Sequence, residues 1–210
     1  HRLLATLHHA RGTATLEAIL GLQEDALRIA RGARLRMPRL ALGDAALEEV
    51  EAELTGDLRV PLGDLALPPT RFTLRATRLT GATESPVDLG DTSIAVALDP
   101  RPAGPTATFE PDAPGIEGEP VRLVMDDGRW SLQAPRVVLQ LASGLPARLL
   151  ARPGLAAEQG TLVTQGRASG SGPSVDAAAF TFELRDTDLD HPGSGAAATG
   201  VAGQVRSRWD

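Results

Sequence analysis

The sequence contains no cysteine, no lysine, no asparagine and no tyrosine. Without cysteine, the chain can form neither disulfides nor thiolate metal sites. Without lysine, it cannot contain the GxxxxGK[ST] loop that binds nucleotide phosphates. All 21 basic residues are therefore arginine, a usage that we attribute to a GC-rich coding bias.

Aromatic residues are scarce as well, at 3% of the chain. Hydrophobic residues nevertheless make up 42% of the 210 residues, which is enough for a sizeable core. Leucine, valine and alanine must therefore supply most of that core.

The chain also lacks the usual signs of nucleic-acid binding and of membrane-spanning helices. Its net charge is −6 and its arginines are spaced singly, which argues against a nucleic-acid partner. The longest apolar windows fall far short of the ~20 residues of a membrane helix, and no signal peptide is present. Because the sequence starts at His1 and ends directly after an alternating run, we expect a fragment of a longer protein, with any export signal or anchor outside it.

The clearest local pattern is a β-hairpin between Val121 and Leu141, with the sequence VRLVMDDGRWSLQAPRVVLQL. Asp127-Gly128 supplies the positive-φ positions that a tight hairpin turn needs. Apolar and polar residues alternate on both sides of the turn, and after Pro135 the alternation resumes at Val137. The pattern predicts two antiparallel strands with one apolar face and one polar face.

Similar alternation recurs along most of the chain and predicts roughly a dozen strands. The segments that show it best are residues 13–22, 27–37, 50–54, 58–62, 72–76, 94–98, 160–170, 180–184 and 201–205. The glutamate-rich residues 48–53 also suit a helix, but their period of two favours a strand. Residues 1–9 and 147–150 fit either a strand or a helical turn, and Gly43-Asp44 is a turn signal.

Residues 99–120 differ from the rest because they hold six of the 16 prolines and show little periodicity. Proline cannot donate a hydrogen bond to a sheet ladder and is excluded from central strands. We therefore interpret 99–120 as a long loop or a soft boundary, a soft break within one continuous β-rich segment that spans residues 1–210.

No arrangement of residues indicates catalysis. The sequence has no GxSxG nucleophile elbow and no GxGxxG loop between a strand and a helix. His8 and His9 are adjacent and do not share a face, so a common metal would need other ligands. Residues 186–190 match the start of a calcium loop, but His191 stands where that loop needs glycine, so we interpret them as a polar turn. We expect no enzyme activity, no metal and no cofactor.

The apolar side of these strands needs a cover. A closed β-sandwich of this size ordinarily fills its centre with aromatic and other large side chains, which are scarce here. We therefore predict an all-β fold in which an elongated, curved antiparallel sheet of many short strands forms an open hydrophobic groove, and a closed β-sandwich is the alternative. A lipid acyl chain would cover such a groove, gaining about 25 cal/mol per Å² of apolar surface buried.

Several segments with short strands and glycine-initiated turns carry a resemblance to a known family. They are GDAALEEVEAELTGDLRV from Gly43, GEPVRLVMDDGRWSLQAPRVVLQL from Gly118, GTLVTQGRASG from Gly160 and GSGAAATGVAGQV from Gly193. Across most of its length the chain resembles the AsmA-like, repeating β-groove proteins of the Gram-negative envelope, particularly the YdbH-type branch.

The resemblance implies phospholipid transport between the inner and outer membranes, and so a part in outer-membrane biogenesis. It also implies a periplasmic location, an inner-membrane anchor outside this fragment, and a small outer-membrane lipoprotein as partner. Phospholipid acyl chains would contact the apolar positions of the groove. These positions are Leu35, Met37, Val50, Leu54, Phe72, Leu74, Ile94, Val96, Val121, Leu123, Trp130, Leu132, Leu139, Phe180 and Phe182.

Two other hypotheses fit the same pattern. In the first, the chain is a structural or adhesive β-sandwich module of an exported protein, and the same residues form an ordinary core. In the second, it is a small subunit of an envelope machine, such as a secretion-system component. Residue spacing does not separate these hypotheses, because lipid and protein present the same apolar surface to a strand.

Overall fold

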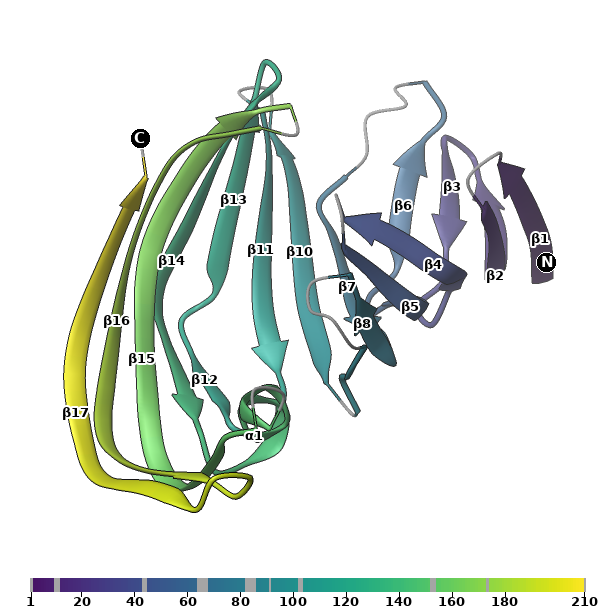
Figure 1. Cartoon of the computed structure of the whole chain (residues 1–210). Helices are drawn as coiled ribbons and strands as arrows, with labels where there is room; N and C mark the ends of the chain where they lie inside the picture. The colour runs from purple at the N-terminus through teal and green to yellow at the C-terminus, as the bar shows by residue number, and fades with distance from the viewer. Residues whose placement is uncertain are drawn as a thin grey trace. The chain divides into compact units, whose positions relative to one another are not determined.

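The computed structural model describes residues 2–9, 12–42, 45–63, 68–81, 86–90, 92–101, 104–151, 154–172 and 174–209. Within them lie 17 strands and a single seven-residue helix, so the all-β prediction is confirmed (Figure 1). The strand pairs are antiparallel and the sheet remains open, as the sequence also predicted. The chain divides into two compact units, residues 1–109 (unit 1) and 110–210 (unit 2).

Unit 1 is built from short and medium strands. They are β1 (Arg2–His9), β2 (Gly12–Gln23), β3 (Ala26–Ile29), β4 (Arg34–Leu42), β5 (Ala45–Leu54), β6 (Leu58–Pro61), β7 (Thr70–Arg75), β8 (Arg78–Thr80), β9 (Val87–Asp88), β10 (Ser93–Arg101) and β11 (Gly104–Asp112), which crosses the division between the units. The strands β1, β2, β4, β5, β7 and β10 pair in that order. The end of β2 pairs with β3, and β3 pairs with β6, in a second small sheet.

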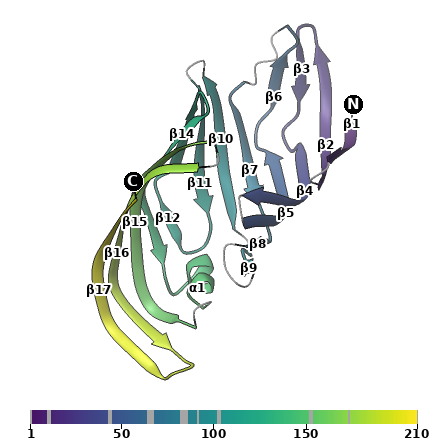
Figure 2. The ribbon, with the colours of Figure 1, turned by 45° about the horizontal axis from the view of Figure 1, so that its top comes forward.

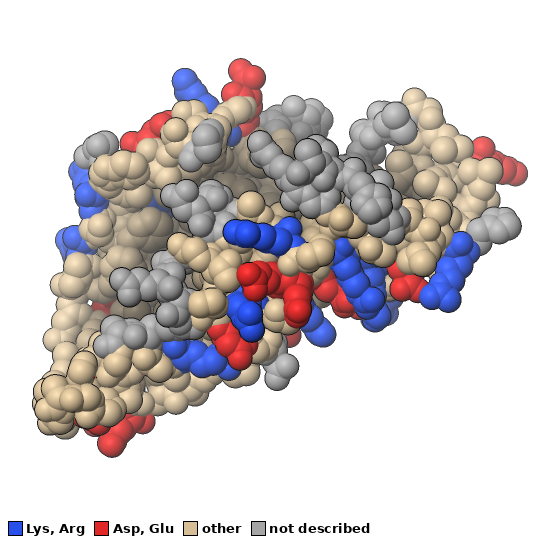
Figure 3. Space-filling view, turned by 45° about the vertical axis from the view of Figure 1, so that its right-hand side comes forward, with Lys and Arg blue, Asp and Glu red and all other residues tan. Residues whose placement is uncertain are grey.

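The strand register in unit 1 separates an apolar face from a charged face. Directly opposed residues share a face, and Leu35 opposes Leu16 on one side and Ala52 on the other. One position along, Arg34 opposes Glu53, and its Nε lies 2.9 Å from the Glu53 carboxylate. In the space-filling view, basic and acidic side chains accordingly lie next to one another rather than in separate blocks (Figure 3). Each such exposed pair adds little stability, but a slip by one residue would break the whole series.

The residues 43–44, for which a turn was predicted, lie outside the described residues. The segments on either side of these residues form strands, as predicted. Residues 48–53 belong to strand β5, and residues 13–22 belong to β2, as their period of two indicated. The N-terminal segment, which fitted strand or helix, is strand β1.

The small sheet of β3 and β6 brings two arginines together. Arg28 lies directly opposite Arg59, and like charges in this position destabilise a strand pair. Asp57 accepts hydrogen bonds from the Arg28 guanidinium and from the Arg31 backbone N–H, and Asp25 accepts one from Arg59. The Arg31 N–H and the Arg28 guanidinium lower the pKa of Asp57, and Arg59 lowers the pKa of Asp25.

We predict that the small sheet loosens in acid because it depends on these two carboxylates. A carboxylate with a lowered folded-state pKa stabilises the fold above its unfolded pKa, and this stabilisation is lost as the pH falls through the folded pKa. Amide hydrogen exchange in β3 and β6 should therefore accelerate between about pH 5 and pH 2, after correction for intrinsic exchange. In Asp25→Asn/Asp57→Asn, protection should be lower at pH 7 and nearly independent of pH over this range. An unchanged pH dependence in the double variant would contradict the prediction.

Unit 2 consists of longer strands and one helix. They are β12 (Ile116–Gly118), β13 (Val121–Asp126), β14 (Arg129–Gln140), α1 (Gly144–Leu150), β15 (Ala156–Ser171), β16 (Ser174–His191) and β17 (Ala196–Trp209). Both β12 and β13 pair with β14, and the order continues through β15 and β16 to β17. In two views β15, β16 and β17 run side by side and bend together (Figures 1 and 2). Residues 147–150, which fitted strand or helix, are helical.

The predicted hairpin between β13 and β14 is present. Its turn residues Asp127 and Gly128 have φ values of 43° and 74°, as the Asp-Gly pair indicated. Further along β14, Pro135 and Arg136 together oppose a single position of β15, which is a β-bulge. Because the bulge adds one residue, Val137 stays on the same face as Ala134, and the apolar side of β14 is continuous across the proline.

A second irregularity bends β15, β16 and β17. Asp186 has a φ of 42°, and the registers of β16 with both neighbours shift there. The following Thr187 is fully buried and lies over Gly160, where any Cβ would collide with its side chain. The prediction of a polar turn at residues 186–190 is therefore wrong, since β16 continues through a bulge to His191. Residues 160–170 are likewise part of a 16-residue strand rather than a short one.

The interpretation of residues 99–120 as a long loop is also wrong. The end of β10, all of β11 and β12 lie in this stretch. Its prolines are accommodated because Pro100, Pro105 and Pro111 lie within one residue of a strand end, where a missing donor costs little. The division between the two units falls within the same stretch, between residues 109 and 110.

Candidate functional site

One face of the unit 2 sheet is apolar from β13 to β17. The register places Leu123, Leu132, Ala168, Ala178 and Trp209 in one cross-strand row. Four further rows run parallel to it. The first contains Met125, Trp130 and Gly170, and the second contains Ala134, Gly166, Phe180 and Ser207. The third contains Val137, Thr164, Phe182 and Val205, and the fourth contains Ile116, Leu139, Leu162, Leu184 and Gly203. We call this surface the apolar face. None of these residues carries a charge, so the surface has no acid, base or metal ligand.

The apolar face carries several large hydrophobic side chains that are exposed to solvent. Large hydrophobic residues of unit 2 that face solvent are Met125 (47% exposed), Val175 (38%), Phe182 (36%), Val205 (64%) and Trp209 (57%). All of them lie on the apolar face, since Val175 opposes Gly170 and the others stand in the rows above. Contiguous apolar surface of this kind marks a binding site in a soluble protein, whereas scattered exposed hydrophobics carry no such meaning.

Two aromatic rings form part of the floor of this face by lying over glycines. Phe180 opposes Gly166, and a Cβ at Gly166 would collide with the Phe180 ring. Trp130 opposes Gly170 in the same manner, and its indole N–H donates to the carbonyl of Gly172 at 3.1 Å. Glycine in a strand often marks such a close approach. Both rings are therefore held flat and only half exposed.

Phe182 extends the aromatic surface beyond this floor. Its ring lies 6.2 Å from that of Phe180, centroid to centroid, at an interplanar angle of 23°. Stacked rings at this spacing attract each other modestly. Phe182 opposes Val205 of the edge strand β17, so the two form an accessible apolar pair at the side of the sheet.

The predicted lining residues of unit 2 fall together on the apolar face. Leu123, Trp130, Leu132, Leu139, Phe180 and Phe182 stand in its rows, and Val121 precedes Leu123 by two residues and shares its side. Sequence reasoning did not select the exposed residues Met125, Val175, Val205 and Trp209. Alternation did place Met125 and Val205 on the apolar sides of their strands, but nothing in the sequence distinguished a buried apolar position from an exposed one.

The predicted residues of unit 1 also share one face, but much of it is covered. The register aligns Leu35, Leu74 and Ile94 through Ala52, aligns Leu54, Phe72 and Val96, and pairs Met37 with Val50. Val50 is 1% exposed and Val96 is 4% exposed, so both belong to the core. The exposed Leu4 and Ile19 lie on the opposite face, beside Glu17 and Arg2. Leu22, Leu62 and Leu98 are exposed as well, and Leu98 shares the face of Ile94 and Val96. Among the described residues of unit 1, the centre of this face is therefore buried and its exposed hydrophobics lie towards the strand ends.

The central aspartate of the segment that resembled a calcium loop already has hydrogen-bond partners. The two carboxylate oxygens of Asp188 accept from the Gly200 backbone N–H at 2.7 Å and from the Gln159 side chain at 2.8 Å. The ring nitrogen Nδ1 of His191 accepts from the backbone N–H of Ser194 at 3.1 Å. In the described part of the chain, no three histidine, aspartate or glutamate side chains converge as a metal site would require. The side chains of His8 and His9 lie outside the described set.

The helix content gives no support for a spanning segment. Among the residues that the structure describes, no helix has the length and hydrophobicity needed to cross a bilayer. Comparison with known proteins identified nothing similar: no family model, no curated protein and no solved structure matches the chain.

Proposed function

We propose that unit 2 binds lipid acyl chains on its apolar face, as a non-enzymatic segment of a protein that transfers phospholipid between the inner and outer membranes of a Gram-negative envelope. The observation that carries the proposal is that the exposed large hydrophobics of unit 2 gather on one uncharged face of an open sheet. An acyl chain matches such a surface because it needs no hydrogen-bond partner and no fixed orientation.

The energetics favour an elongated apolar ligand. Burial of each methylene gives about 0.8 kcal/mol, whereas the loss of ligand freedom costs about 4 kcal/mol or more, so at least about five methylene groups must be buried to offset it. A long acyl chain can place that many against Phe182, Val205 and the neighbouring rows. The rows from β13 to β17 offer a continuous path for such contacts across the sheet. The periplasmic location, the inner-membrane anchor and the small outer-membrane lipoprotein partner belong to the same proposal.

A structural or adhesive module is the second candidate, and unit 1 favours it. The buried Val50 and Val96, with the small β3 and β6 sheet, make unit 1 the better-closed part of the chain. If this candidate held for the whole chain, the apolar face of unit 2 would be covered by protein instead of lipid.

The test is the lipid content of the purified chain. We expect native mass spectrometry and lipid extraction to find phospholipid bound to the chain when it is purified from bacterial membranes in mild detergent. Delipidated chain should take up phospholipid again from vesicles. A lipid-free monomer that melts cooperatively and takes up no phospholipid would overturn the proposal and favour the structural module.

A further inference from the structure

The polar face of unit 2, on the other side of the sheet, carries a basic hollow. Register places Ala179 of β16 between Arg167 of β15 and Arg208 of β17. In the neighbouring row, Thr181 lies between Gln165 and Arg206. The short side chains of β16 thus form a floor, and the longer side chains of β15 and β17 rise on either side of it.

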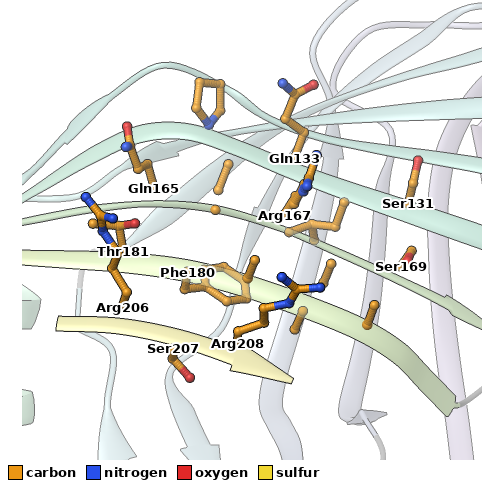
Figure 4. A pocket seen from close by; sticks show the side chains of 18 residues that line it. Ser131, Gln133, Gln165, Arg167, Ser169, Phe180, Thr181, Arg206, Ser207 and Arg208 are labelled. Atoms are coloured by element: carbon orange, nitrogen blue, oxygen red, sulfur yellow. The ribbon is translucent and has the colours of Figure 1, made fainter. Parts of the chain in front are cut away.

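A hollow of about 840 Å³ lies at this place, and we call it the arginine hollow. Its lining includes Arg167, Arg206 and Arg208 and contains no aspartate or glutamate. Figure 4 shows the side chains of Arg206 and Arg208 extending from β17 across β16, whereas Ser207 between them points away. Hydroxyl and amide groups surround the guanidinium groups, and those of Ser131, Gln133, Gln165, Ser169 and Thr181 supply further hydrogen-bond donors.

The neighbouring carboxylates of β16 form hydrogen bonds with residues that do not line the hollow. Both oxygens of Glu183 accept hydrogen bonds from Arg185, at 2.7 and 2.9 Å, and Asp176 accepts from the Ser171 hydroxyl. Arg206 donates a long hydrogen bond, at 3.4 Å, to the neutral side chain of Gln204. Among the described residues that line the hollow, Arg167 has no carboxylate neighbour. Arg167 and Arg206 therefore bring positive charge into the hollow, in a chain whose net charge is −6.

We propose that the arginine hollow binds a phosphate group, carried by a soluble ligand or by a lipid headgroup. A phosphate oxygen pair matches the planar donor fork of a guanidinium, and charge-assisted hydrogen bonds of this kind are about twice as strong as neutral ones. Bound phosphate would also relieve the repulsion between the arginines. The hollow lies on the polar side of β14 to β17, so this proposal stands independently of the apolar face.

Binding is tested by titration of the chain with inorganic pyrophosphate, followed by calorimetry. Vesicles of phosphatidylglycerol and of phosphatidylcholine serve as a second probe, in a flotation assay. We expect Arg206→Gln and Arg167→Gln each to weaken binding about tenfold, since each removes one charge-assisted contact. The double variant should show no measurable binding. Arg122→Gln is the control, because Arg122 is on the same face in the row of Gln133 and Arg167 but does not line the hollow.

The two probes separate the sources of the phosphate. Pyrophosphate binding that depends on Arg167 and Arg206 would support a soluble phosphate ligand. Selective binding to phosphatidylglycerol vesicles with the same dependence, without pyrophosphate binding, would support a lipid headgroup. Absence of binding to either probe would overturn the proposal, and so would an equal loss in Arg122→Gln.

Discussion

Replacement of Gly166 by valine should lower the free energy of unfolding of unit 2 by about 2–3 kcal/mol. In an ordinary strand the opposite sign is expected, because valine has a higher β-propensity than glycine. At Gly166, however, the new Cβ would collide with the Phe180 ring and come within 2.6 Å of the Ala179 carbonyl oxygen. Phe180 would have to leave its position and with it the stacking on Phe182. Urea denaturation followed by tryptophan fluorescence measures the change, since Trp130 and Trp209 both lie in unit 2.

Gly203→Val is the matched control. Gly203 lies on the same apolar face, opposite Leu184 in the edge strand, and a Cβ there would meet nothing within 4 Å. This variant should be neutral or slightly stabilising. Equal effects of Gly203→Val and Gly166→Val would show that the Phe180 ring does not lie over Gly166. A smaller cost of Gly166→Val in a Phe180→Ala background would locate the clash at the ring.

Gly166 and Gly170 explain why the sequence predicted that a strand exists at β15 but did not predict its full length. In β15 the positions on the apolar face include Gly166, Ala168 and Gly170, which give a weak alternation signal. Their small size is required by rings that belong to neighbouring strands, and a neighbour in space is not visible in a single sequence. The strand therefore looked shorter than its 16 residues.

The hairpin at Asp127-Gly128 was predictable because all of its determinants are local. The turn needs two positive-φ residues and the flanking strands need period two, and both features can be read within about twenty residues. The bend at Asp186 was missed for the opposite reason. An aspartate with positive φ can occur in a turn or in a bulge, and the register shift beside the buried Thr187 over Gly160 identifies it as a bulge.

The apolar face itself was partly predictable. Alternation identified which residues share a side, and the bulge at Pro135 preserves that side through the change of parity in β14. The solvent exposure of these apolar side chains was not predictable from the sequence. It depends on whether another part of the fold packs against that face of the sheet. Val50 and Val205 occupy equivalent alternating positions in sequence, yet one is 1% exposed and the other 64%. The arginine hollow was likewise invisible, since it requires the register of β15, β16 and β17.

Two aspartates on the apolar face should weaken phospholipid binding about a hundredfold. Val175 and Val205 are exposed there, at 38% and 64%, so Val175→Asp/Val205→Asp should leave the fold intact. Each carboxylate must keep its water and forfeits apolar contact with the acyl chain, at a cost on the order of 1.4 kcal/mol or tenfold in affinity. Vesicle uptake by delipidated chain, quantified by lipid extraction and native mass spectrometry, measures the loss.

The preceding residue of each strand supplies a control of equal charge. Ser174 and Gln204 are exposed on the polar face, so Ser174→Asp/Gln204→Asp adds the same two charges one residue away and on the other side of the sheet. Phospholipid uptake by this variant should equal that of the unmodified chain. If both double variants lost uptake equally, repulsion by net charge rather than contact with the apolar face would explain the effect, and lipid binding would have to be sought elsewhere on the chain. A loss confined to Val175→Asp/Val205→Asp would show that acyl chains lie against β16 and β17 on the side that carries Phe182, because the two variants differ only in the face that receives the charges.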